Sequence, residues 1–92
     1  MYVIIRTYSA GCFAGDLESK DKDEVVLTNA RRLWRWVGAA TLSELAVEGT
    51  SDPRECNFAV PVPRITLPNV IEIIETTDVG RKSIQEVPKW HI

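Results

Sequence analysis

The sequence predicts an α+β domain that is mostly β: a curled antiparallel sheet or small barrel of five to six short strands, with one short helix at about residues 41–48 and a second at about 78–86. Three observations support this fold class. Stretches rich in β-branched and aromatic residues recur along the chain, turn-forming residues separate them, and one clear helix-start signature stands in the middle. With 92 residues, the chain has room for a single domain, residues 1–92.

The first half of the chain is predicted to consist of strands and turns. Residues 2–8 carry apolar groups on both faces, which predicts a central strand. Glycines mark a turn at residues 9–15, and the polar tip 20–23 closes a hairpin between the flanking apolar segments. Residues 30–37 form the next strand. Its alternation places Arg32, Trp34 and Trp36 on one face and Arg31, Leu33 and Arg35 on the other.

Two further strands are predicted in the second half. Residues 56–60 form a short strand suited to a sheet edge, because the following Pro61 and Pro63 cannot donate ladder hydrogen bonds. Residues 64–76 are the strongest β-forming run of the chain, with a bulge or bend at residues 68–69. We expect this run to be the core strand.

Both helices have a start signal. Thr41 and Glu44 fit a capping box, in which the threonine hydroxyl caps a free amide and the glutamate reaches back to the cap residue. Gly49 ends this helix after about two turns. The helix at 78–86 is capped by Thr77 or Asp78, although a glycine inside it lowers its propensity.

Composition excludes several classes of protein. The net charge of −2 and the pI near 5.3 disfavour duplex nucleic acid as the partner. Cys12 and Cys56 are expected to be free thiols in the cytoplasm, because the N-terminus lacks a secretion signal, and no apolar run is long enough for a membrane span. No spacing of histidines or cysteines suggests a metal site, and no cofactor is expected. A domain this small gains from self-association, so we expect a homo-oligomer.

A first candidate ligand site lies between residues 31 and 43. Arginines clamp phosphate oxygens, indole rings stack on bases, and a helix start offers amides to negative charge. The residues concerned are Arg31, Arg32, Trp34, Trp36 and Thr41. The alternative is structural: one tryptophan and Leu33 in the core, the other tryptophan at a subunit contact, and the arginines paired with carboxylates.

A second candidate is the turn after the first strand. Glycine-rich backbone approaches ligands closely, and hydroxyl and guanidinium donors stand beside it, which singles out Arg6, Tyr8, Ser9 and Gly11. The alternative is a plain bend between two strands, with Phe13 in the core. An enzyme is not expected, because the single histidine, His91, is one residue from the C-terminus and no clustered carboxylates accompany it.

The chain resembles an uncharacterised family of small phage and prophage proteins about ninety residues long. The resemblance lies in residues 3–11 (VIIRTYSAG) with 13–15, 29–34 (NARRLW) with 38–40 and 45–46, and 70–74 (VIEII) with 87–90. It implies a phage protein acting in the cytoplasm of an infected bacterium. Small phage proteins of this type include homo-oligomeric sponges that counter bacterial defence by sequestering nucleotide second messengers.

The leading hypothesis is therefore a non-enzymatic, homo-oligomeric sponge for a cyclic dinucleotide or an ADP-ribose-type signal. Arg31 and Arg32 would bind phosphates, Trp34 or Trp36 and Tyr8 would stack bases, and amides near Gly11 and residues 38–41 would complete the site. The alternative is a module that binds and inhibits a host or phage protein through exposed tryptophans. A third hypothesis is binding of single-stranded nucleic acid on the strand that carries arginine and tryptophan.

Overall fold

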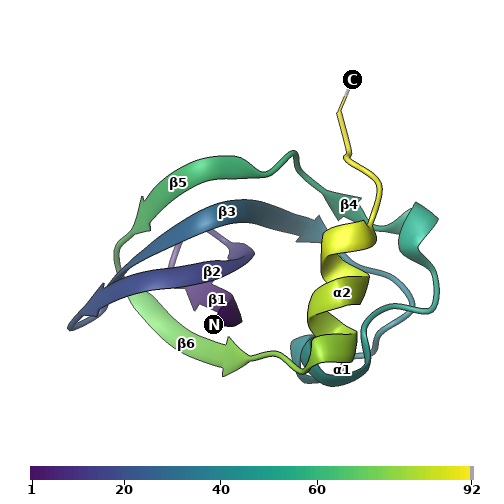
Figure 1. Cartoon of the computed structure of the whole chain (residues 1–92), viewed down its shortest axis with the longest axis horizontal. Helices are drawn as coiled ribbons and strands as arrows, with labels where there is room; N and C mark the ends of the chain where they lie inside the picture. The colour runs from purple at the N-terminus through teal and green to yellow at the C-terminus, as the bar shows by residue number, and fades with distance from the viewer. Residues whose placement is uncertain (92) are drawn as a thin grey trace.

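Six strands form one antiparallel sheet, and two helices pack together at one end of it (Figure 1). The computed structural model describes residues 1–91, so Ile92, the last residue of the predicted domain, lies outside the described residues. The strands in that range are β1 (Tyr2–Thr7), β2 (Cys12–Asp21), β3 (Glu24–Arg35), β4 (Asn57–Phe58), β5 (Val62–Leu67) and β6 (Val70–Glu75). The helices are α1 (Leu42–Glu48) and α2 (Asp78–Glu86), with a 3-10 turn, η1, at Pro53–Glu55. The predicted α+β, mostly β fold is confirmed.

The sheet is curled but not closed. Its strand order is β4-β3-β2-β1-β6, and β5 lies beside β4 on the same side of β3. The long β3 pairs with β5 through its first half and with β4 through its last residues. β5 and β6 are therefore opposite edges that meet only at the corner of residues 68–69, as Figure 1 shows on the left. Of the two predicted forms, the structure is the curled sheet.

The predicted core strand at residues 64–76 is wrong in two respects. The run is two strands, β5 and β6, because Pro68 lacks an amide donor and Asn69 turns the chain with a φ of +56°. β6 is also an edge strand that pairs, within residues 1–91, only with β1, and Ile71 is more than half exposed. The central buried strand is β1, as predicted from its apolar residues on both faces. The β-branched residues of this run thus predicted strand formation correctly, but they did not predict whether the strand is buried.

Two hydrophobic clusters lie on opposite faces of β1. Tyr2 and Ile4 point to the face that the helices cover, and Val3 and Ile5 point to the face enclosed by the curl of the sheet. The helix-side cluster also contains Ala14, Leu33, Leu45, Ala46, Cys56, Phe58, Ile84 and Val87, and the other cluster contains Phe13, Val25, Leu27, Ala30 and Leu67. The molecule therefore has two hydrophobic cores, one on each face of the sheet.

The helix signals predicted α1 and α2 correctly. The Thr41 hydroxyl accepts from the Glu44 amide at 3.1 Å, whereas the Glu44 carboxylate accepts from the Ala40 amide, one residue before the predicted one. Thr77 caps α2 by accepting from the Gly80 amide at 3.0 Å, and its hydroxyl donates to the Val47 carbonyl at 2.6 Å. The Thr77 cap thus also ties α2 to α1.

Candidate functional site

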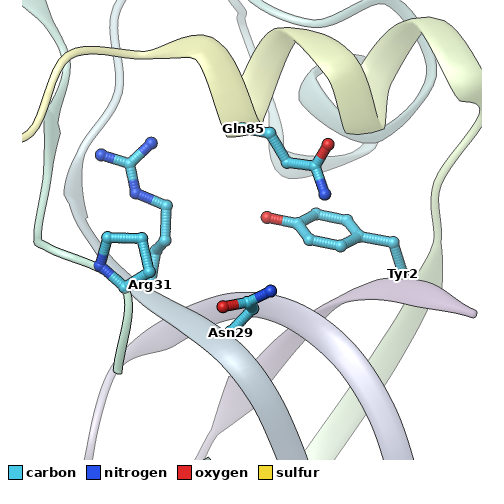
Figure 2. Close-up of a pocket in the computed structure, with 5 residues that line it drawn as sticks. Tyr2, Asn29, Arg31 and Gln85 are labelled. Atoms are coloured by element: carbon cyan, nitrogen blue, oxygen red, sulfur yellow. The ribbon is translucent and has the colours of Figure 1, made fainter. Parts of the chain in front are cut away.

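A pocket of about 230 Å³ lies between the start of β1, the middle of β3 and the last turn of α2 (Figure 2). Tyr2 and Arg31 are its buried base, with only 4% and 2% of their surfaces exposed. Asn29, Pro61 and Gln85 are exposed and form its rim. In Figure 2 the Tyr2 hydroxyl points into the space between Arg31, Gln85 and Asn29. We call this the Tyr2–Arg31 pocket.

A β-bulge turns Asn29 toward the pocket. In the pairing of β2 with β3, Ala14 lies opposite Arg31 and Asp16 opposite Thr28, so Gly15 faces two residues, Asn29 and Ala30. Asn29 has a φ of +50°, a left-handed conformation that asparagine tolerates better than most residues. A side chain at Gly15 would lie 2.9 Å from the Thr28 carbonyl oxygen. Glycine at this position therefore lets the bulged backbone approach β2 closely.

The Arg31 guanidinium is held by the backbone. Its Nε donates to Ala59 O at 2.9 Å, Nη1 donates to Ile84 O and Val87 O at 2.8 Å each, and Nη2 donates to Phe58 O at 3.0 Å and Pro88 O at 3.4 Å. Five bonds use all five N–H groups of a guanidinium. Arg31 therefore has no donor left for a phosphate. The prediction that it clamps a phosphate directly is corrected: Arg31 joins β3 to the end of α2 and the segment after β4.

The pocket carries positive charge in a partly desolvated place. No carboxylate within residues 1–91 forms an ion pair with Arg31, and burial lowers the pKa of its guanidinium. Burial also raises the pKa of Tyr2 to about 12, against the opposing effects of the Arg31 and Arg81 charges, and Asp16 raises it slightly further. Tyr2 is thus a neutral phenol at physiological pH. Within the described residues its buried hydroxyl has no hydrogen-bond partner.

Five of the predicted site residues gather at the opposite end of β1, away from the pocket. Arg32 stacks on the Phe13 ring at 4.5 Å and donates to Ala10 O at 2.9 Å, which joins β3 to the turn after β1. That turn contains the exposed Tyr8, Ser9 and Gly11. Trp34 follows on β3 and is 68% exposed. These residues form a surface of arginine and aromatic groups that we call the Arg32–Trp34 surface.

The turn itself follows the structural alternative more than the ligand hypothesis. Gly11 has a φ of +97°, and its carbonyl accepts from both the amide and the hydroxyl of Thr7. The Ala10 amide donates to the Thr7 hydroxyl at 2.9 Å, and the Tyr8 amide donates to Asn69 O. These amides are therefore engaged within the fold.

Arg6, Trp36 and Thr41 lie elsewhere. Arg6 is on the helix-side face of β1 and pairs with Glu72 on β6 at 3.2 Å. It lies opposite Cys12 on β2, whereas Arg32 lies opposite the next residue, Phe13, so the two arginines are on different faces of the sheet. Trp36 is half-buried against the helix-side cluster. Thr41 uses its hydroxyl as the α1 cap, and the Glu44 carboxylate occupies the neighbouring Ala40 amide. Of the amides predicted to hold an anion at residues 38–41, that of Ala40 is thus already bonded to a carboxylate.

The pocket residues other than Arg31 were not predicted from the sequence. Tyr2 was assigned only to the first strand, Pro61 to an edge and Gln85 to the second helix. One signal was present: an asparagine between two β-forming segments is typical of a bulge or turn. The meeting of Tyr2 and Gln85 at one pocket depends on tertiary packing, which no local sequence pattern contains.

Neither cysteine belongs to the pocket. Both are free thiols. Cys56 is buried and exchanges hydrogen bonds with the Val37 backbone, and burial raises the pKa of the half-buried Cys12 thiol, against the charge of Arg6. Residues 1–91 contain no cluster of three or more potential metal ligands. No helix in the described part of the chain has the length and apolar character needed to cross a membrane.

The chain belongs to a family described as a domain of unknown function (DUF6948), whose model matches residues 1–84. The match includes Tyr2, Asn29, Arg31 and Pro61 and ends one residue before Gln85. No curated protein and no solved structure matched the chain.

Proposed function

We propose that this member of the DUF6948 family is a non-enzymatic protein that captures a nucleotide-derived molecule in the Tyr2–Arg31 pocket. The observation that carries the proposal is the Tyr2 hydroxyl, which is buried, has no partner within residues 1–91 and faces a space shared with a buried cation. A buried polar group without a partner costs about 1–3 kcal/mol. A ligand that forms a hydrogen bond with this hydroxyl removes that cost, which favours the binding of a polar molecule.

The groups lining the pocket favour capture over catalysis. Acid–base catalysis at neutral pH needs a side chain whose pKa lies near 7. Tyr2, with its pKa raised to about 12, stays protonated, and Arg31 stays charged. The amides of Asn29 and Gln85 and the ring of Pro61 do not titrate. These groups bind and orient a ligand without exchanging protons with it.

The size of the pocket supports a ligand that extends beyond it. Its 230 Å³ lie below the roughly 300–1,000 Å³ typical of sites that enclose drug-sized molecules. A cyclic dinucleotide or an ADP-ribose derivative would place one group in the pocket and the rest outside. In the proposed homo-oligomer, a second copy of the chain covers that remainder, and the exposed Trp90 provides apolar surface for such contacts.

The biological setting of the proposal comes from the resemblance to small phage proteins. A phage protein in the cytoplasm of an infected bacterium that holds a defence messenger without converting it would lower the free concentration of that messenger. This is the anti-defence sponge expected from the sequence. The pocket supports the binding step, and the resemblance supports the setting.

Isothermal titration of the purified protein against cyclic dinucleotides and cyclic ADP-ribose isomers tests the proposal. At least one of them should bind with measurable heat and be recovered unchanged. Gln85→Ala, at the exposed rim, should weaken that binding, whereas Trp34→Ala should not alter the contacts inside the pocket. Absence of heat from every member of the panel would refute nucleotide capture.

A protein-interaction module is the second candidate, because the exposed aromatic residues favour it. Tyr8 is 80%, Trp34 68% and Trp90 49% exposed, and tryptophan and tyrosine are enriched at interface hot spots. Affinity capture from infected cells separates the two functions. Loss of a protein partner in Trp34→Ala together with its retention in Gln85→Ala would favour the module.

A further inference from the structure

In the Tyr2–Arg31 pocket, the positive charge and the available hydrogen-bond donors come from different residues. Arg31 contributes a positive charge, but its five N–H groups already donate to carbonyls. The donors that remain available are the Tyr2 hydroxyl and the side-chain NH2 groups of Asn29 and Gln85, whereas the Gln85 side-chain oxygen already accepts from Arg81 at 3.2 Å. A guest therefore receives its hydrogen bonds from neutral donors and its charge stabilisation from a guanidinium that it does not bond directly.

The charge at the base of the pocket defines the charge of the guest. Arg31 is the one charged residue among those that line the pocket, and no carboxylate within residues 1–91 forms an ion pair with it. Arg81, on α2 one turn before Gln85, is already paired with Asp78 at 3.7 Å, and Asp16 lies opposite Tyr2 in the pairing of β1 with β2. One negative charge on the guest balances the charge of Arg31, whereas a second negative charge would remain uncompensated.

We propose that the pocket takes the singly charged phosphodiester group of the nucleotide, whose oxygens accept hydrogen bonds from the Tyr2 hydroxyl and from the Asn29 and Gln85 amides. This inference rests on the proposed function and names the part of the ligand that enters the pocket. A phosphodiester has two free oxygens that share one negative charge, which suits neutral donors beside a cation. It is also small enough for a pocket that does not enclose a whole nucleotide.

Three probes in phosphate-free buffer test the assignment: dimethyl phosphate, cyclic AMP and adenosine. Dimethyl phosphate is the phosphodiester alone, cyclic AMP joins it to a nucleoside, and adenosine lacks it. We expect the first two to shift the side-chain amide NMR signals of Asn29 and Gln85, and adenosine to leave them in place. Binding of dimethyl phosphate would show that the isolated group suffices, and tighter binding of cyclic AMP would show a contribution from the nucleoside.

Tyr2→Phe removes the central hydrogen bond without adding volume. It also removes a buried unpartnered hydroxyl, so the variant should remain folded. We expect its affinity for cyclic AMP to fall about tenfold or more, the loss typical of one hydrogen bond to a charged group. The control Tyr8→Phe, which changes an exposed hydroxyl at the other end of β1, should bind as the wild type does.

One charge variant separates an anionic guest from a neutral one. Asp16→Asn removes a negative charge near Tyr2 and should strengthen the binding of an anion. A neutral guest would not respond to this change. Equal binding of adenosine and cyclic AMP, unaffected by Tyr2→Phe, would overturn the phosphodiester assignment and leave nucleotide capture intact. Failure of all three probes to shift the amide signals would also overturn the phosphodiester assignment. The titration with cyclic dinucleotides would then test nucleotide capture separately.

Discussion

Replacing Arg31 by lysine tests whether this arginine is structural. An ammonium group offers three donors and cannot reproduce the planar fork that reaches five carbonyls, so at least two bonds are lost. Ile84 O and Phe58 O also accept backbone bonds from Val87 and Trp90, which lessens the effect of losing Arg31 there. Pro88 is exposed and its carbonyl receives the longest of the five bonds, at 3.4 Å, so the main cost falls on the carbonyls of Ala59 and Val87.

The magnitude follows from those two carbonyls. At about 1–2 kcal/mol for each buried acceptor left without its donor, Arg31→Lys should lower the free energy of unfolding by about 2–4 kcal/mol. For a domain of this size, such a loss lowers Tm by roughly 10–25 °C. Urea titration and thermal melts followed by far-UV circular dichroism measure both quantities.

The matched control is Arg32→Lys, the same change at the neighbouring position. Arg32 donates a hydrogen bond to Ala10 O and stacks on Phe13 at the surface, so its replacement should cost about 1 kcal/mol or less. An Arg31→Lys protein that melts with the wild type, or an Arg32→Lys protein that loses as much stability as Arg31→Lys, would refute the structural role given to Arg31.

Three further predictions concern the helices and Tyr2. Gly80→Ala should lower the free energy of unfolding by about 2 kcal/mol or more in urea titrations, because the added Cβ would overlap the Ala46 carbonyl. This loss should outweigh the better helix propensity of alanine. A more stable variant would show that α1 and α2 do not pack as described. Thr77→Ala should cost about 1 kcal/mol in the same assay through loss of the α2 cap, and an unchanged midpoint would contradict that role. Stability should fall as pH rises from 10 to 12, because the unfolded state ionises Tyr2 near its ordinary value of 10 and the folded state only near 12. Tyr2→Phe should show a smaller fall in that window, and an identical fall in both proteins would contradict the burial of this phenol.

The local elements of this fold were predictable because their signals are local. The Thr41 and Thr77 caps each depend on a hydroxyl and an amide three residues apart, and both were found at the predicted positions. The hairpin tip closes at residues 22–23, where Lys22 adopts a positive φ, within the predicted polar segment. Each of these features requires only a few consecutive residues.

Burial and pairing were less predictable because they depend on distant segments. β6 has the composition of a core strand, yet it is an edge, since β5 pairs with β3 and not with β6. Arg31 was correctly predicted to lie on the strand face of Leu33, and it is buried there. Its five acceptors come from residues 58–59 and 84–88, and no local pattern shows that carbonyls from these segments converge on one side chain.

The two buried groups at the base of the pocket link stability to binding. Arg31 stabilises the fold through its carbonyl partners, yet it leaves a positive charge without a carboxylate partner within residues 1–91, and the unpartnered Tyr2 hydroxyl adds its own cost. Both costs fall when an anionic guest binds. A guest that binds only the folded state at 100 times its Kd stabilises a protein by about 2.7 kcal/mol, which is a large fraction of the stability of a small domain. Thermal melts with and without cyclic AMP therefore report pocket occupancy. The rise in Tm should be much smaller in Tyr2→Phe, because that variant lacks the hydroxyl that bonds to the guest.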